Sequence, residues 1–172
     1  MEIVLFSKFF EELSVEELGE KTVELGYDGI VYVDSQNLAA DCYVVLAMAA
    51  AATTRLKLGT GVTNSFTRHP AVTAGAMASI QALSGGRAYL GIGRGDSALA
   101  HLGLAPHAVA PFERYLIELQ AYLLGEEVPF DETDVDALGL ADTPVASHIP
   151  WIEAAGPKVP VDVAATGPRV IA

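Results

Sequence analysis

Small polar and charged residues follow four apolar segments of strand length, and their types could do chemistry. Carboxylates can move protons, while hydroxyl and amide groups can hold the polar edge of a ligand. The set shows no Ser-His-Asp order, no metal-ligand spacing and no Walker lysine, so it predicts a polar ligand site of another kind. Its members are Asp34 and Ser35 after residues 29–33, Thr63 and Asn64 after 56–62, Asp96 after 88–93, and Thr166 and Gly167 after 161–165.

Three members of the polar set have a simpler structural interpretation. Asp34 and Asp96 could each cap the turn or helix that follows them. Taken together at the ends of neighbouring strands, they look more like parts of one polar site. His69 precedes Pro70, so it could be a helix-entry residue or a ligand contact, and both interpretations stay open.

The segment GIGRGDS, residues 91–97, permits three interpretations. A dinucleotide loop requires G-x-G-x-x-G opening the first βα unit, and this G-x-G-x-G follows the fourth strand. The RGDS tetrapeptide of cell adhesion requires an exposed loop of a secreted protein, and the N-terminus MEIVLF carries no basic region of a signal peptide. Close approach of a flat, bulky group to the backbone explains the glycines better.

Strand-like and helix-like segments alternate along the chain, which indicates βα units and a parallel α/β sheet. The expected strands are residues 3–6, 29–33, 56–62, 88–93 and 161–165. We expect four helices: the first begins at the capping box of Ser14 and Glu17, and the other three span about 41–54, 71–83 and 111–124. Two closures remain open, a doubly wound sheet and a (β/α)8 barrel. A barrel needs roughly 250 residues, and this chain has 172.

The character of the sequence changes after residue 124. Residues 1–124 hold four βα units, and 125–157 carry acidic residues, prolines and scattered apolar residues without a sustained period, which predicts an insertion or irregular loop. Residues 158–172 hold the fifth strand and the start of another helix. If the fold is a barrel, we expect the chain to be its truncated N-terminal portion, with about five βα units.

The amino-acid composition limits the classes of molecule that the protein could bind. The net charge of −12 and a pI near 4.5 argue against a nucleic-acid or anionic-membrane surface. No apolar run approaches the roughly 18–20 residues that span a bilayer. Cys42 is the single cysteine, which excludes an internal disulfide and a cysteine-based metal site and fits a cytoplasmic location. We expect a small-molecule partner and no metal.

Residues 58–103, LGTGVTNSFTRHPAVTAGAMASIQALSGGRAYLGIGRGDSALAHLG, resemble the bacterial luciferase-like flavin-dependent oxidoreductases. They look closest to the deazaflavin-dependent branch, which includes methylene-tetrahydromethanopterin reductase, and VYVDSQ and PVDVAATGPRVIA fit the same pattern. The resemblance implies a (β/α)8 TIM barrel that holds coenzyme F420, or alternatively FMN, at the carboxyl ends of its strands. It further implies hydride transfer to a small organic substrate and a homo-oligomeric full-length protein.

The resemblance also implies roles for individual residues. The bond Gly61-Val62 matches a cis peptide in a bulge that backs the ring system. Asp96 first and Asp34 second match catalytic carboxylates that transfer a proton or orient the substrate, and His69 matches a substrate contact. The cofactor contacts implied are Ser35, Gly61, Val62, Thr63, Asn64, Gly93, Gly95, Ala165, Thr166 and Gly167.

One departure from the family pattern leaves a second function open. The last three strands of such a barrel, which contribute much of its phosphate-binding surface, are missing from this sequence. The alternative is therefore a non-catalytic barrel half that acts as a scaffold or pairs with another copy through its open strand edges.

Overall fold

A computed structural model describes residues 3–130, 133–139, 142–165 and 167–171. Its main sheet is parallel throughout: β1, β2, β3 and β5 lie side by side in that order, and β4 and β8 both pair with β5. The described strands show none of the order reversal that defines a doubly wound sheet. The strands are β1 (Val4–Phe6), β2 (Gly29–Tyr32), β3 (Lys57–Thr60), β4 (Thr63–Asn64), β5 (Ala88–Gly93) and β8 (Val161–Val163).

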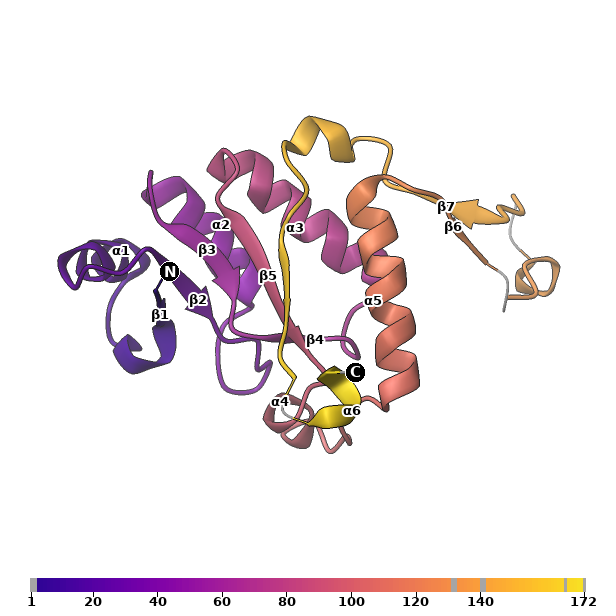
Figure 1. Cartoon of the computed structure of the whole chain (residues 1–172), viewed down its shortest axis with the longest axis horizontal. Coiled ribbons are helices and arrows are strands. Elements are labelled where there is room, and N and C mark those ends of the chain that lie inside the picture. Colours follow the sequence, from indigo (N-terminus) through magenta and orange to yellow (C-terminus); the bar gives the residue numbers. More distant parts are fainter. Residues whose placement is uncertain (1–2, 131–132, 140–141, 166, 172) are drawn as a thin grey trace.

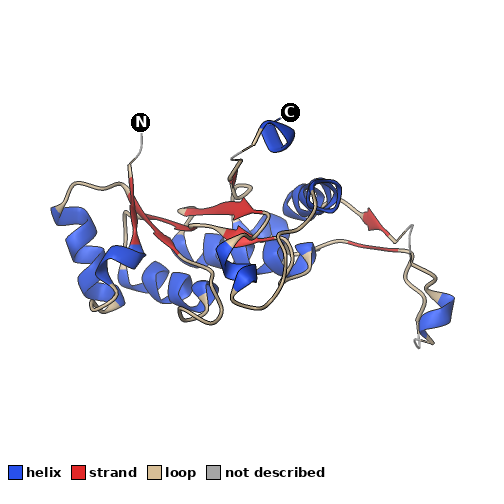
Figure 2. Cartoon of the chain, turned by 90° about the horizontal axis from the view of Figure 1, so that it is seen from below, coloured by secondary structure: helices blue, strands red, loops and turns tan. Residues whose placement is uncertain are grey.

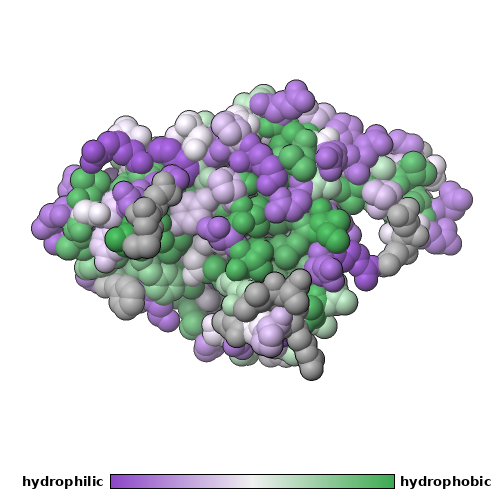
Figure 3. Space-filling view, viewed as in Figure 1, coloured by the Kyte–Doolittle hydropathy of each residue, from purple (hydrophilic) through white to green (hydrophobic). Residues whose placement is uncertain are grey.

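Helices cover one face of this sheet. Figure 2 shows α1, α2 and α3 below the strands, and Figure 1 looks onto the opposite face. Figure 3 shows apolar side chains gathered in the middle of that opposite face. The helices and helical turns are α1 (Val15–Glu24), α2 (Cys42–Ala52), α3 (Pro70–Ser84), α4 (Ser97–Ala100), α5 (Val109–Leu124), α6 (Pro168–Ile171), and the 3-10 turns η1 (Ser7–Phe10), η2 (Asp136–Leu138) and η3 (Ile152–Ala155).

Local sequence sets where the helices begin. The expected capping box of α1 is present, with Glu17 N donating to Ser14 Oγ at 3.2 Å and Ser14 N to Glu17 Oε2 at 2.8 Å. Asp41 Oδ1 accepts from the first backbone N–H groups of α2, and Pro70 occupies the first turn of α3, where its missing N–H costs nothing. These N-termini follow the carboxyl ends of strands, so they lie at one end of the sheet.

The core lies between the sheet and its helices. Ile30, Leu58 and Leu90 on three neighbouring strands are fully buried against Leu46 of α2 and Met77 of α3. Burying each such side chain contributes about 1.5–3 kcal/mol. The helix-covered face therefore supplies the main apolar stabilisation of the domain.

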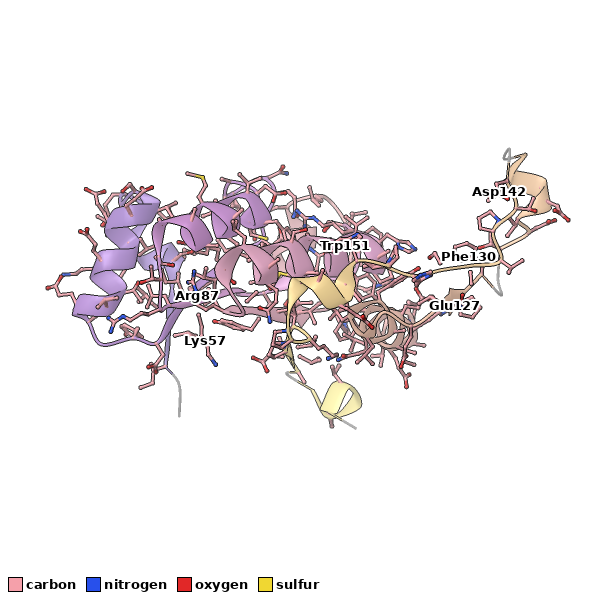
Figure 4. The ribbon with its side chains drawn as sticks, turned by 90° about the horizontal axis from the view of Figure 1, so that it is seen from above. Lys57, Arg87, Glu127, Phe130, Asp142 and Trp151 are labelled. Atoms are coloured by element: carbon pink, nitrogen blue, oxygen red, sulfur yellow. The ribbon has the colours of Figure 1, made fainter. Side chains whose placement is uncertain are left out.

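At the amino ends of the strands, Arg87 joins the ends of two helices. Its guanidinium donates through all five N–H positions, at 2.7–3.0 Å, to Ser84 O, Leu56 O, Thr53 Oγ1, Thr53 O and Ala50 O. Burial lowers the pKa of this guanidinium. Figure 4 looks onto this end of the molecule. The acceptors include carbonyl groups that terminate α2 and α3, so Arg87 serves as a structural cap.

Residues 125–157 differ from the expected irregular loop. They contain a small antiparallel ladder, β6 (Val128–Pro129) with β7 (Ala146–Ser147), which extends away from the body as an arm (Figures 1 and 4). Tyr122 of α5 contacts Ser147, with the two hydroxyl oxygens 2.7 Å apart. Strands of two residues are too short to leave a periodic pattern in the sequence, which explains the difference.

The main elements otherwise follow the expected ranges within a few residues, and β5 matches residues 88–93 at both ends. The short helix α4, Ser97–Ala100, was not expected. Among the helices that the structure describes, none is long and apolar enough to cross a membrane.

Candidate functional site

A cleft of about 870 Å³ lies at the carboxyl ends of the strands. Its walls come from β4 and from the segments after β1, β2, β3, β5 and β8, so chain segments far apart in sequence meet there. The structure brings together nine of the residues expected at the site, namely Ser35, Gly61, Val62, Thr63, Asn64, Gly93, Gly95, Asp96 and Gly167.

A bulge in the third strand projects Val62 into this cleft. Gly59 pairs with Tyr89 and Thr63 with Ile92, so three residues lie between these pairs on one strand and two on the other. The peptide bond Gly61-Val62 within the bulge is cis, as the resemblance predicts. The side chain of Val62 is 40% exposed, and it forms part of the cleft wall.

Two glycines of β5 make room for Val62. A Cβ placed on Gly91 would lie 3.1 Å from Val62 Cγ1, and one on Gly93 would lie 3.3 Å from Val62 Cγ2. Because both glycines lack a side chain, Val62 can rest close to the backbone of β5. The glycines of this segment thus accommodate a valine of the same chain.

Asn64 lines the cleft and carries a buried hydrogen-bond donor. Its side chain is 1% exposed, and its Oδ1 accepts from Phe66 N at 3.0 Å and Thr67 N at 2.9 Å. Backbone N–H groups can only donate, so the amide oxygen must face them and the nitrogen must point the other way. Nδ2 is buried and has no partner among the residues that the structure describes. A buried unpaired donor is costly, so Asn64 is suited to a ligand that offers an acceptor.

Asp96 reaches the same cleft through Gly95. Gly95 has a φ of +77°, and a Cβ there would lie 2.8 Å from Asn64 Cβ and from Leu99 Cγ, so only glycine fits. Asp96 precedes α4, yet within the described part of the chain its carboxylate makes no capping hydrogen bond. It is exposed and lines the cleft. Capping therefore does not explain this aspartate.

The structure places Asp34 behind the cleft wall, not on it. Asp34 is 2% exposed, and its carboxylate accepts from Gln36 Nε2 at 2.6 Å, Thr63 Oγ1 at 2.6 Å and Arg68 at 2.8 Å. It lies outside the set of described residues that line the cleft. Its oxygens are engaged by these internal donors, so this geometry does not favour the expected catalytic contact by Asp34, which stays a prediction.

Arg68 is the centre of a charged cluster under the cleft. Its guanidinium pairs with Asp34 at 2.8 Å and with Asp41 at 2.7 Å, and it lies 4.5 Å from the centre of the Tyr43 ring. Burial acts to lower the pKa of Arg68, but Asp34, Tyr43 and Asp41 together raise it above its usual value. Burial, reinforced by the charge of Asp34, also raises the pKa of the Cys42 thiol, which is therefore protonated and unreactive.

Three further expected site residues fall elsewhere. His69 Nδ1 accepts from Ala71 N at 3.2 Å and caps α3, as the helix-entry interpretation predicts, and His69 lies outside the cleft lining among the described residues, so the substrate contact stays a prediction. Ala165 is half-buried and lies outside the cleft lining among the described residues. Thr166 lies outside the described residues.

The cleft also contains three residues for which no role was expected. Lys8 and Arg94 line it, as their positions shortly or directly after strands indicate, and His101 lines it without such a signal. His107 Nδ1 lies 2.9 Å from Ser65 Oγ, and burial together with Arg94 lowers its pKa. Sequence alone gives no signal for this pair, because 42 residues separate its members. Within the described residues, no group of His, Cys, Asp and Glu could hold a metal ion.

Known proteins share this arrangement. The family model described as luciferase-like monooxygenase matches residues 14–172. The chain belongs to this family. Among relatives, 5,10-methylenetetrahydromethanopterin reductase of Methanolobus tindarius is 34% identical over 137 residues, which cover 78% of this chain and 42% of the relative.

Two solved structures share the fold of this luciferase-like chain. The coenzyme F420-dependent tetrahydromethanopterin reductase from Methanopyrus kandleri aligns with a TM-score of 0.70 and 23% identity, over 99% of this chain and 51% of that one. An F420-dependent secondary alcohol dehydrogenase aligns with a TM-score of 0.74 and 16% identity, over 98% and 53%. The chain thus spans about half the length of these relatives.

Proposed function

We propose that the chain is the N-terminal part of an F420-dependent oxidoreductase that transfers a hydride to or from a small organic substrate. The buried, unpaired Nδ2 of Asn64 at the wall of an 870 Å³ cleft is the observation that carries this proposal. Family membership and an F420-dependent solved relative with a TM-score of 0.70 support it.

The cleft residues fit a flat, polar-edged ring system. Val62 offers an apolar surface for a ring face, and Asn64 Nδ2 offers a donor for a carbonyl oxygen at the ring edge. Ser35, Gly93, Gly95 and Gly167 complete the wall with small residues. When bound, the deazaflavin supplies the hydride donor or acceptor.

Asp96 is the proposed acid–base residue. Its exposed carboxylate lies at the cleft without a capping hydrogen bond in the described structure, so it is available to the substrate. It would hold or release a proton at a carboxylate oxygen while Val62 and Asn64 fix the position of the ring. Asp34, surrounded by its own donors, would keep Thr63 in place.

The face of the sheet opposite α1, α2 and α3 supports a barrel that closes with further strands. Apolar side chains gather on that face (Figure 3), and a (β/α)8 barrel would bury it. We therefore propose that this chain is a truncated barrel of about five βα units. The full-length enzyme would supply the remaining substrate-binding loops and would form a homo-oligomer.

Titration of the protein with oxidised F420, followed by its fluorescence, tests the proposal. We expect saturable binding in the micromolar range, and the same titration with FMN decides between the two cofactors. Binding of FMN alone would correct the cofactor, and binding of neither would overturn the function. A cofactor-free, monodisperse dimer would favour a scaffold instead.

A further inference from the structure

The inference concerns Arg68, in the loop between β4 and α3. Its guanidinium bridges Asp34, after β2, and Asp41, which caps α2, at 2.8 and 2.7 Å. The side chain of Arg68 is 16% exposed and that of Asp34 is 2% exposed. One partly buried guanidinium therefore connects three segments at the carboxyl ends of the strands.

The connection continues from Asp34 to the bulge. Asp34 Oδ2, which Arg68 contacts, also accepts from Thr63 Oγ1 at 2.6 Å. An ionised carboxylate only accepts, so the single hydroxyl proton of Thr63 is directed at Asp34. Tyr43 completes the chain by donating its hydroxyl proton to Thr63 Oγ1 at 3.3 Å. Both side-chain hydrogen bonds of Thr63 are thus made to residues inside the protein, Asp34 and Tyr43.

Thr63 stands between two residues of the cleft wall. Val62 precedes it in the bulge, and Asn64 follows it with the unpaired amide donor. Because peptide units are stiff, fixing the side chain of Thr63 restricts where both neighbours can lie. The position of the cleft wall therefore depends on a hydrogen bond made behind it.

We propose that Arg68 is a positioning residue that, through Asp34 and Thr63, sets the place of Val62 and Asn64 in the cleft wall. The ligand-binding part of this proposal rests on the function proposed above. Asp34 then acts as a link between Arg68 and the bulge, without proton transfer to the substrate.

Stability alone does not account for this cluster. Replacing a buried ion pair by apolar side chains is often neutral or stabilising, because both charges lose their hydration. Arginine suits the position for a geometric reason, since its planar fork reaches two carboxylates while lying over the Tyr43 ring. Lysine offers one point charge and cannot hold both.

A double-mutant cycle tests the proposal. The variants are R68M, D34N and the double variant, with R55M as a matched control because Arg55 is exposed near the amino end of the sheet. With oxidised F420 as the probe, we expect each single variant to raise Kd about tenfold or more. The Kd of the double variant should not exceed the larger of the two single-variant Kd values, since both substitutions break the same path from Arg68 through Asp34 to Thr63. An unchanged Kd in R68M, or additive losses, would overturn the proposal.

A measurement without ligand separates this proposal from the proposed function. In 15N–1H spectra, R68M and D34N should shift the backbone amides of Val62, Thr63 and Asn64, whereas R55M should leave them in place. If the wild-type protein binds neither F420 nor FMN, the proposed function fails and these shifts still decide the role of Arg68. Unmoved amides would overturn it.

Tyr43→Phe provides a milder variant in case R68M does not fold. The variant removes the hydroxyl group that donates a hydrogen bond to Thr63 Oγ1 and alters no charge. We expect it to shift the same amides and to raise the Kd for F420 about twofold to threefold, as the loss of one modest hydrogen bond would. Unmoved amides in Tyr43→Phe would contradict the proposal.

Discussion

The two ends of the sheet each carry a partly buried arginine, and the two side chains are satisfied in different ways. Arg87, at the amino ends, donates to carbonyl and hydroxyl oxygens that belong to helix ends and loops. Arg68, at the carboxyl ends, pairs with two carboxylates, and at the same end the buried amide nitrogen of Asn64 has no partner among the described residues. The Arg87 guanidinium thus uses all its donors on neutral oxygens of the fold, whereas Arg68 is held by charge. This difference separates residues that stabilise the fold from residues suited to function.

The largest effect is expected at the amino ends of the strands. Arg87→Met removes five hydrogen bonds and leaves their acceptors without this partner, which should lower the free energy of unfolding by about 3 kcal/mol. Urea denaturation measures this loss. The Kd for F420 of the folded variant should stay within a factor of two or so, because Arg87 lies at the opposite end from the cleft. A large rise in Kd with native stability would break the comparison.

Asp96→Asn should lower turnover and leave stability nearly unchanged, the reverse of Arg87→Met. Turnover should fall about 100-fold, since the amide cannot exchange a proton as the carboxylate does. Stability should change by less than about 0.5 kcal/mol, because among the described residues this carboxylate makes no capping hydrogen bond. Steady-state oxidation of reduced F420 and thermal unfolding measure the two quantities. Full turnover in the variant would remove Asp96 from the proposed site.

Asn64→Asp tests the unpaired donor directly. The substitution keeps the shape but replaces Nδ2 by an acceptor, so a ligand carbonyl would lose its donor and meet a negative charge. We expect the affinity for F420 to fall by about 2 kcal/mol, or roughly 30-fold. Asn64→Ala, which removes the donor without adding charge, should lose less. Equal affinities in both variants and the wild type would show that Asn64 does not contact the cofactor.

Gly93→Ala should produce a smaller change through Val62. The new methyl group would lie 3.3 Å from Val62 Cγ2 and 3.6 Å from Ala164 Cβ, so Val62 must move by a few tenths of an ångström. We expect about 1 kcal/mol of lost cofactor affinity, roughly fivefold. Isothermal titration measures it. The control is Gly75→Ala on α3, where the nearest atom lies 3.8 Å away on Trp151.

The smallest expected effect is on the stability of the protein at low pH. The pKa of Asp41 is lowered, since the backbone N–H of Val44 and the side chain of Arg68 outweigh the opposing effect of burial. A lowered folded-state pKa stabilises the protein above the unfolded value of about 3.9, and this contribution is lost as pH falls through the folded value. The stability difference between wild type and Asp41→Asn should therefore shrink below about pH 4. A difference that is constant from pH 6 to pH 3 would contradict this assignment.

Local signals sufficed for most elements of the fold. The capping box at Ser14 and Glu17, the proline at the start of α3 and the glycine after its end act over a few residues, so they can be identified in the sequence. The resemblance located the cis bond Gly61-Val62. The β6–β7 ladder was missed because its strands have two residues each. Position after a strand does not show where a side chain points, so the sequence could not show that Asp34 and His69 lie outside the cleft lining among the described residues.

The sequence by itself determined the alternation of strands and helices, the helix starts, and which segments end at the ligand-binding edge, because these depend on neighbouring residues and on the period of apolar positions. Only the tertiary structure decided which polar groups satisfy one another. Arg68 meets Asp34 across 34 residues, and Thr63 meets it across 29. Strand register and helix packing set such distances, so the same packing occupies Asp34 and leaves the buried amide nitrogen of Asn64 without a partner among the described residues.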